Sequence, residues 1–259
     1  MMIFDTHAHY DDAAFDSDRD ALLLSMNEHG VGKLVNVCAS VGEFDRTIAL
    51  TEKYPFVYGA VGVHPDDADK MTAQTLDEIR QIARREKFVA IGEIGLDYYW
   101  HKEQAEHERQ KQMFRAQLDI AQQEKLPFMV HSRDAAQDTL EIVREYVQGG
   151  SMYGGIIHCF SYGPEIAAEY LKMGLYLGIG GVVTFKNARK LKEVVAMAPL
   201  EQLVLETDCP YMAPEPHRGT RNSSFNLPFV AAAIAALKGI TADEVIAVTT
   251  QNAERLLSV

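Results

Sequence analysis

Six side chains that can bind metal ions stand at or near the ends of short apolar runs in this sequence. They are His7, His9, Glu93, His131, His158 and Asp208. Imidazole and carboxylate ligands suit Zn²⁺ or Mn²⁺, and carboxylates together with water also admit Mg²⁺. Divalent ions held in this way can activate a water molecule for attack on an ester. The residue types therefore predict a metal-dependent hydrolase.

The spacing of these residues indicates which of them can meet. His7 and His9 are two residues apart, and alternate residues of a strand face the same side. Glu206 and Asp208 end another apolar run with the same spacing. A pair of ions about 3.5–4 Å apart needs a bridging carboxylate, and Glu93, in the middle of the group, is the predicted bridge.

Each of these residues taken alone has a simpler explanation. A histidine at the end of an apolar run is often a buried structural residue, and an isolated HxH pair is often incidental. The six together favour the metal site. Cys159 and Cys209 directly follow His158 and Asp208, so strand alternation is expected to turn both thiols away from the ions.

The apolar runs themselves predict the fold. Eight of them begin near Met2, Lys33, Phe56, Phe88, Pro127, Gly155, Leu175 and Leu203. Polar amphipathic segments separate them, for example residues 18–30, 44–54, 76–86, 103–125 and 243–257. This alternation is typical of repeated βα units and a parallel sheet. Eight units, without a GxGxxG motif after the first run, favour a (β/α)8 TIM barrel, one α/β domain that spans residues 1–259.

A closed parallel barrel would bring the predicted ligands into one small volume, because all its strand ends open onto a single mouth. Active sites of such barrels lie at this mouth. The proline-rich segment 209–226 follows the eighth run and is predicted to be a long loop over the mouth. A helix is expected to begin after it, near Pro228.

Four other residues near the predicted mouth are expected to contact substrate. Arg133 lies two residues beyond His131, and a guanidinium can bind an oxyanion through two hydrogen bonds. His64 follows the third run and is equally open to a structural role. Arg218 and Arg221 lie in the mouth loop, where solvated surface charge is the ordinary alternative to substrate binding.

Three adjacent aromatic residues, Tyr98, Tyr99 and Trp100, follow the fourth run. In a loop at the mouth, such rings can stack on nucleobases. Packing against a neighbouring helix is the other use for these side chains, and it is expected for at least two of the three.

Composition limits the range of partners. The 259 residues carry a net charge of −12, which argues against a broad basic surface for duplex nucleic acid. A DNA or other phosphodiester bound in a local cleft is compatible with this charge, because metal ions neutralise phosphate at close range. No membrane span, secretion signal or obligatory protein partner is evident, and three cysteines fit a reducing compartment, so the cytoplasm is expected.

Taken together, these motifs resemble those of the TatD family of metal-dependent deoxyribonucleases, within the amidohydrolase-type barrels. The similarity covers essentially the whole chain, in the family's order. It is carried by residues 5–9 (DTHAH), 62–65 (GVHP), 92–98 (GEIGLDY), 130–133 (VHSR), 158–161 (HCFS), 184–187 (TFKN), 205–210 (LETDCP) and 252–256 (NAERL). Many related barrels bridge their metals with a carboxylated lysine on strand four. This chain has Glu93 there, as in the nuclease-like branch.

The resemblance implies a site for two divalent ions, Mg²⁺, Mn²⁺ or Zn²⁺, and 3′→5′ exonuclease or related phosphodiesterase activity on DNA. It assigns one ion to His7 and His9, and the other to His131 and His158. Glu93 would bridge the two ions.

Asp208 has the central role in the leading hypothesis, which is phosphodiester hydrolysis. It would lie on the first ion and act as general base for the metal-activated water, while Arg133 offsets charge on the phosphoryl oxygens. The same ligands would also serve a metal-dependent esterase, a lactonase or a D-aminoacyl-tRNA deacylase. A non-catalytic barrel that binds nucleic acid or protein is a third alternative, opposed by the intact set of ligands.

Overall fold

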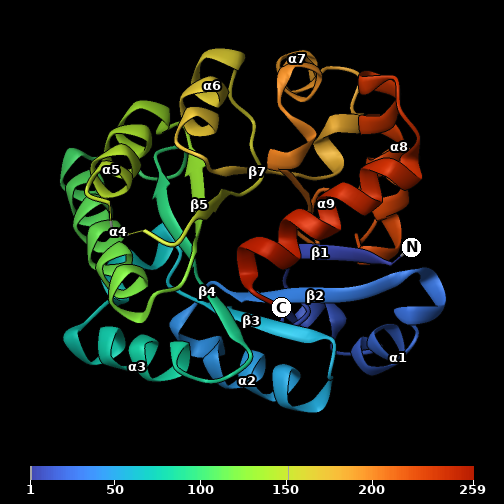
Figure 1. Cartoon of the computed structure of the whole chain (residues 1–259). Helices are drawn as coiled ribbons and strands as arrows, with labels where there is room; N and C mark the ends of the chain where they lie inside the picture. The colour runs from blue at the N-terminus through green and yellow to red at the C-terminus, as the bar shows by residue number, and fades with distance from the viewer. Residues whose placement is uncertain (1, 151) are drawn as a thin grey trace.

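The computed structural model describes residues 2–150 and 152–259, and within them eight parallel strands form one sheet in the order β1 to β8. The strands are β1 (Ile3–Ala8), β2 (Val31–Cys38), β3 (Val57–Val61), β4 (Phe88–Asp97), β5 (Phe128–Arg133), β6 (Gly155–Ile157), β7 (Tyr176–Ile179) and β8 (Leu203–Leu205). Helices cover the outside of the sheet (Figure 1). The strands form a nearly closed (β/α)8 TIM barrel, so the predicted fold class is confirmed.

One or two helices follow each strand. They are α1 (Arg19–Leu24), α2 (Phe44–Lys53), α3 (Ala73–Ala83), α4 (Gln104–Glu124), α5 (Ala136–Gln148), α6 (Pro164–Lys172), α7 (Arg189–Met197), α8 (Leu227–Lys238) and α9 (Ala242–Leu257). Across the described residues, no helix is both long enough and apolar enough to cross a membrane.

Three elements have bounds that differ from the predicted ones. Helix α3 begins three residues before the predicted position 76, because Thr72 and Thr75 form a capping box at its start. Helix α1 ends at Leu24, well before the predicted position 30, and a short 3-10 turn leads to Gly30 at φ 78°. Strand β4 was expected to end at Glu93, but it continues to Asp97.

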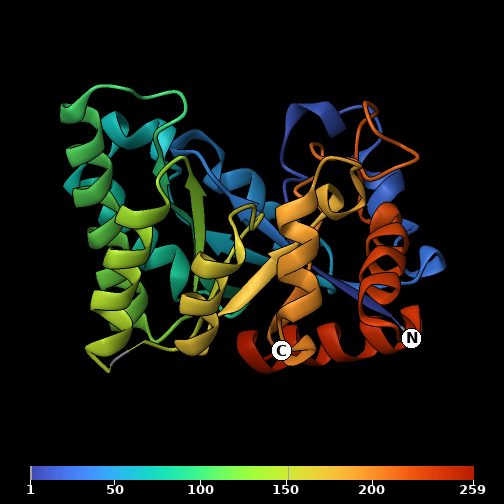
Figure 2. The same ribbon diagram turned by 90° about the horizontal axis from the view of Figure 1, so that it is seen from above.

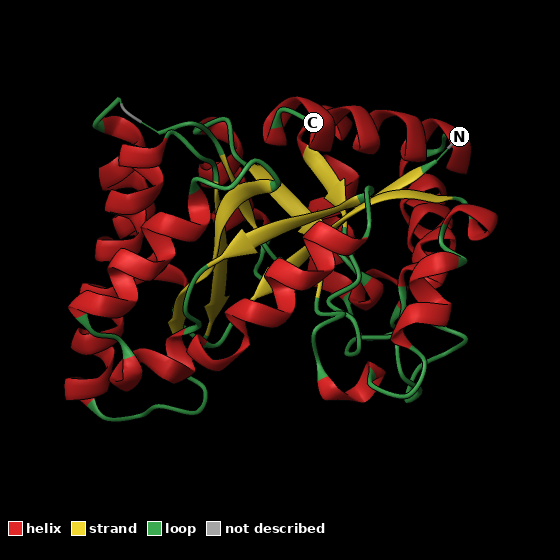
Figure 3. Cartoon of the chain, turned by 90° about the horizontal axis from the view of Figure 1, so that it is seen from below, coloured by secondary structure: helices red, strands yellow, loops and turns green. Residues whose placement is uncertain are grey.

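The inside of the barrel is polar at the carboxyl ends of the strands and apolar toward their amino ends. Met129 and Ile156 lie two residues before His131 and His158, and so share their faces of β5 and β6. These apolar residues pack with residues of the other strands and with Ala253 and Leu257 of α9. The strand residues are Phe4, Val35, Val37, Ala60, Val89, Ala90 and Val204. Helix α9 therefore closes the end of the barrel at which the strands begin (Figures 2 and 3).

Backbone and side chains both join β1 to β8. In the described residues an isolated bridge pairs Ala8 with Cys209, and the N–H groups of His9 and Asp208 donate to the carbonyls of Cys209 and His7 at 2.9 Å each. Side-chain hydrogen bonds add to this junction. The carboxylate of Asp5, which is fully buried, accepts hydrogen bonds from the hydroxyl of Thr207 at 2.7 Å and from that of Ser224 at 2.6 Å. The backbone N–H of Thr207 adds a third bond at 3.0 Å. Burial raises the pKa of Asp5 to about 7, against these bonds, which favour the ionised form.

Replacing Asp5 tests this account of the junction. We expect Asp5→Ala to lower the free energy of unfolding by about 3 kcal/mol, because it leaves several buried donors without an acceptor. Asp5→Asn keeps one acceptor oxygen and should lose less. Urea unfolding at pH 8, where the carboxyl is ionised in both states, measures both variants. Equal stability of Asp5→Ala and the unmodified protein would show that the carboxylate is not what joins the strands.

Candidate metal centre

The structure brings the six predicted ligands together at the carboxyl ends of the strands. They lie in five strands or in the residues just after them: His7 and His9 (β1), Glu93 (β4), His131 (β5), His158 (β6) and Asp208 (β8). Five of them line a cavity of about 950 Å³, and the sixth, His7, is 1% exposed. The barrel thus assembles the constellation that the sequence predicts.

The carboxylate of Glu93 occupies the centre of this group. Its Oε2 lies 3.4 Å from Nε2 of His7 and 3.8 Å from Nε2 of His9. Its Oε1 lies 2.7 Å from Nδ1 of His131 and 3.6 Å from Nε2 of His158. The two oxygens therefore divide the imidazoles into two pairs, and a carboxylate in this position is suited to bridge two ions.

Asp208 lies on the His9 side of the group. Its Oδ1 is 3.2 Å from Nε2 of His9 and 3.7 Å from Nε2 of His158, while the Nε2 atoms of His7 and His9 are 3.2 Å apart. Lone pairs of imidazoles and carboxylates thus converge on one small volume, which is unfavourable unless protons or cations occupy it. Nitrogen and oxygen donors in this mixture fit Zn²⁺ or Mn²⁺.

Polar contacts outside the group restrict two of the imidazoles. Nδ1 of His9 lies 2.8 Å from the carbonyl oxygen of Val37, which can only accept, so His9 carries a proton on Nδ1 and turns Nε2 toward Glu93. Nδ1 of His158 lies 3.0 Å from Oε1 of Glu206, a fully buried carboxylate. Glu206 also accepts a bond from the backbone N–H of Cys159 at 2.6 Å.

Asp97 is a site residue that the sequence analysis missed. Its Oδ2 lies 3.2 Å from Nε2 of His131, and its side chain is almost fully buried. Strand alternation could have found it, because Asp97 is four residues beyond Glu93 and therefore faces the same side of β4. The signal was lost because the strand was expected to end at Glu93.

Mutual charge stabilisation holds the ion-free group together. Burial alone would raise the pKa of Glu93, but the neighbouring imidazoles of His158, His131 and His7 hold it well below its usual range. Burial alone would lower the pKa of the histidines, but adjacent carboxylates raise that of His9 to about 10 and that of His131 to about 10. Carboxylates likewise raise the pKa of His158 to about 9.

The four predicted substrate contacts lie in different places. Arg133 and His64 line the cavity. His64 packs edge-on against His131, and its Nδ1 accepts a bond from the backbone N–H of Asp66 at 3.2 Å. Because burial and the charge of His131 lower the pKa of His64 to about 4, the ring is neutral and carries its proton on Nε2, 3.9 Å from Glu93.

The two arginines of the mouth loop are not among the cavity-lining residues. Arg218 lies over the ring of Phe185, with Cζ 4.3 Å from the ring centroid, and Phe185 does line the cavity. Arg221 forms an ion pair with Asp18 and donates to the carbonyl of Ala14. This arrangement gives Arg221 a role in fastening the mouth loop to the segment before α1 and none in the cavity.

The expectation for Cys159 was wrong. Strand β6 ends at Ile157, and Cys159 has φ 44°, so strand alternation no longer applies to its side chain. Cys159 lines the cavity, and His158, Cys159 and Asp208 form one of the clusters with metal-binding geometry. Cys209 is fully buried in an apolar cluster, as expected for a small apolar residue.

Comparison with known proteins agrees with this geometry. The profile of a family described as TatD related DNase matches residues 4–258. The chain belongs to the TatD family. Its relatives include the metal-dependent hydrolase YabD of Bacillus subtilis, 42% identical over 258 residues, which are 100% of both chains. The metal-dependent hydrolase YcfH of Escherichia coli is 35% identical over 262 residues, covering 100% of this chain and 97% of that protein.

A solved structure of another TatD-family protein has the same fold. The crystal structure of YjjV, a TatD homologue from Escherichia coli, superposes with a TM-score of 0.91 at 32% identity. The match covers 99% of this chain and 98% of that one. The barrel and its order of elements are therefore those of a TatD-family protein throughout.

Gly178 allows a test of the Glu206 contact without changing a charged residue. A Cβ at Gly178 would lie 2.1 Å from Oε2 of Glu206, so Gly178→Ala should displace this carboxylate from His158. We expect metal affinity to fall about tenfold, as measured by competition with a chelating dye. Gly42→Ala, which meets no atom within 4 Å, is the matched control. Unchanged affinity in Gly178→Ala would mean that Glu206 does not position His158.

The raised pKa values predict that metal uptake releases protons. His9, His131 and His158 are protonated at neutral pH in the ion-free protein, because their pKa values are about 9 to 10. A metal ligand must be a neutral imidazole, so metal affinity should fall as the pH is lowered. Calorimetry in two buffers with different ionisation enthalpies measures the released protons. Identical heats in both buffers would contradict this charge state.

Proposed function

We propose that this TatD-family metal-dependent hydrolase cleaves phosphodiester bonds of DNA, removing nucleotides from the 3′ end with the aid of two divalent ions. The observation that carries the proposal is the position of Glu93 between two pairs of imidazoles, with Asp208 beside one pair. The description of the family as a DNase family supports DNA as the substrate.

The site residues have distinct places in this reaction. His7 and His9 would hold one ion, His131 and His158 the other, and Glu93 would contact both. When bound, the ions would lower the pKa of a water molecule and offset charge on the phosphodiester.

We infer that Asp208 acts as the general base. Burial alone would raise its pKa, but His9, His158 and His7 hold it below the usual range, so the carboxylate is ionised and able to accept a proton. It lies at the cavity wall, with its side chain 16% exposed, where a substrate can reach it. Oδ1 would take the proton from the attacking water.

Two side chains of the cavity wall suit the phosphate itself. The guanidinium of Arg133 can bind phosphoryl oxygens through two hydrogen bonds. Neutral His64 presents an Nε2–H group toward Glu93 and can donate it to a substrate oxygen. Neither side chain forms part of the two imidazole pairs around Glu93, so both remain available for substrate when the ions are bound.

The charge of the cavity makes phosphate binding depend on the ions. Besides Glu93 and Asp208, the lining includes Asp11, Asp12, Glu43, Asp66 and Asp97. An excess of carboxylates repels a phosphodiester at short range, and divalent ions reverse this repulsion. The arrangement therefore favours a substrate whose anionic group is bound through metal.

Two substitutions test the catalytic assignment. Asp208→Asn removes the base and Glu93→Gln weakens the bridge, so each should lower turnover of single-stranded DNA by about 10² to 10⁴-fold while the fold is retained. Asp12→Asn, which changes a carboxylate of the same cavity outside the imidazole group, should keep most activity. The assay follows shortening of 3′-labelled and 5′-labelled strands by metal-stripped protein refilled with Mg²⁺, Mn²⁺ or Zn²⁺.

The same assay distinguishes the rival reactions. Metal-dependent loss from the 3′ end that requires Asp208 supports the proposal and ranks the metals. Near-normal activity of Asp208→Asn or Glu93→Gln would refute the assigned roles. Absence of cleavage with every metal, together with hydrolysis of an acyl ester, would identify the site as that of an esterase.

A further inference from the structure

The three aromatic residues after β4 have different environments. Tyr98 stacks on His107 with ring centroids 3.6 Å apart, and its hydroxyl donates to Asp138 at 2.7 Å, so it packs against α4 and α5. Tyr99 and Trp100 are 42% and 65% exposed. Exposure of this much aromatic surface is unfavourable in water, so packing within the chain accounts for Tyr98 but not for Trp100.

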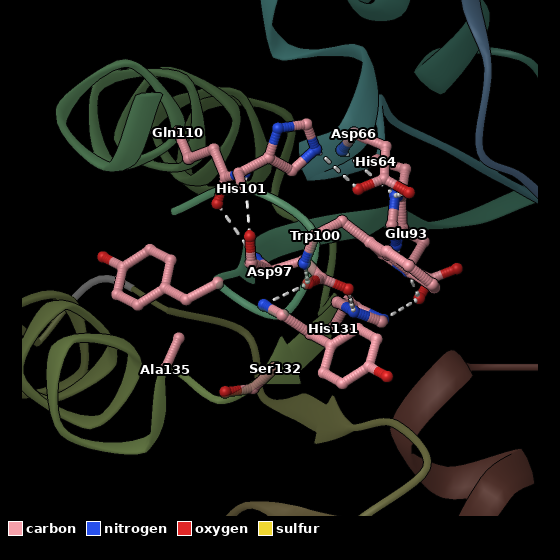
Figure 4. A network of polar contacts seen from close by, with 12 residues as sticks. His64, Asp66, Glu93, Asp97, Trp100, His101, Gln110, His131, Ser132 and Ala135 are labelled. Atoms are coloured by element: carbon pink, nitrogen blue, oxygen red, sulfur yellow. Dashed lines mark hydrogen bonds and ion pairs between the residues drawn. The ribbon is translucent and has the colours of Figure 1, made fainter. Parts of the chain in front are cut away.

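Trp100 is held at a defined position beside the metal centre. Oδ1 of Asp97 accepts hydrogen bonds from the backbone N–H groups of Tyr99 at 2.8 Å and Trp100 at 3.3 Å. The other oxygen of Asp97 lies 3.2 Å from Nε2 of His131 (Figure 4). One carboxylate thus contacts both the backbone of the aromatic loop and an imidazole of the centre, so the loop begins directly beside the centre.

The positively charged side chain of Arg133 lies beside the two exposed aromatic rings. The guanidinium of Arg133 lies over the ring of Tyr99, with Cζ 3.9 Å from the ring centroid and 5.6 Å from that of Trp100. Trp100 and Arg133 both line the cavity that contains Glu93. Among the ion pairs of the described residues, none involves this guanidinium.

We propose that Trp100, with the Arg133–Tyr99 pair beside it, is a stacking site for the nucleobase of the nucleotide whose phosphate is bound at the metal centre. A flat aromatic surface next to a phosphate-binding cation matches a nucleotide, which joins a π-face to an anion. Stacking of this kind accepts every base, so Trp100 would select for the presence of a base and not for its identity. The substrate class rests on the proposed function, whereas binding of a nucleotide does not.

Trp100 is the only tryptophan in the chain, so its fluorescence reports this site alone. The test is a titration of the metal-loaded protein with deoxyadenosine 5′-monophosphate and, separately, with 2-deoxyribose 5-phosphate, excited where adenine does not absorb. We expect saturable quenching by the nucleotide and none by the sugar phosphate at the same concentration. Equal responses to both, or unchanged emission with the nucleotide, would overturn the proposal.

Kinetics test the same site in turnover. We expect Trp100→Ala to lower the preference for a 3′-terminal nucleotide over an abasic 3′ terminus, expressed as the ratio of kcat/KM values, by at least about fivefold. Trp100→Phe keeps a stacking ring and should restore most of this ratio. Tyr153→Ala, a change at an exposed aromatic residue outside the cavity lining, is the matched control and should leave the ratio unaltered.

The two measurements separate this proposal from the proposed function. Base-dependent quenching without DNA cleavage would support the stacking site and refute the exonuclease assignment. Normal cleavage with an unchanged ratio in Trp100→Ala would refute the stacking site and leave the exonuclease assignment standing. Loss of the ratio in Trp100→Ala and its recovery in Trp100→Phe would support both.

Discussion

The carboxylate of Asp5 joins the first strand of the barrel to the segment after the last one. Its partners Thr207 and Ser224 lie more than two hundred residues away in the chain, so the bonds that it accepts close a very long loop. The backbone N–H of Asp208 in turn donates to the carbonyl of His7 at 2.9 Å. This junction keeps Asp208 next to the histidines of β1, with Oδ1 3.2 Å from Nε2 of His9.

The metal centre combines buried charges that would be unfavourable one by one. Glu93 is 4% exposed and lies within 4 Å of five imidazoles. Its carboxylate favours the protonated form of these rings, and the nearby rings in turn hold the pKa of Glu93 well below its usual range. Outer contacts from Val37, Glu206 and Asp97 then restrict how the rings can turn. A centre built in this way keeps its shape before any ion arrives, which reduces the entropy lost on binding.

Sequence patterns were sufficient for the strands and for the grouping of the six predicted side chains, because period and short spacing decide both. They were insufficient where long-range contacts or backbone geometry decide the position of a side chain. Arg221 pairs with Asp18, which is 203 residues away, so no local pattern could assign its role. The positive φ of Cys159 places its thiol at the cavity, and a pattern of alternating residues does not contain that angle. Asp97 was overlooked because β4 continues beyond Glu93.

Helix α9 limits how substrate and product can enter and leave the barrel. Its side chains Ala253 and Leu257 complete the apolar packing inside the strands, and Asn252 donates to the carbonyls of Leu200 and Leu203 at 2.8 Å each. The barrel is therefore closed at the end where the strands begin, and a polymer strand cannot pass through it. A product must leave through the same mouth by which the substrate enters. Product release and binding of the next substrate therefore compete for one opening.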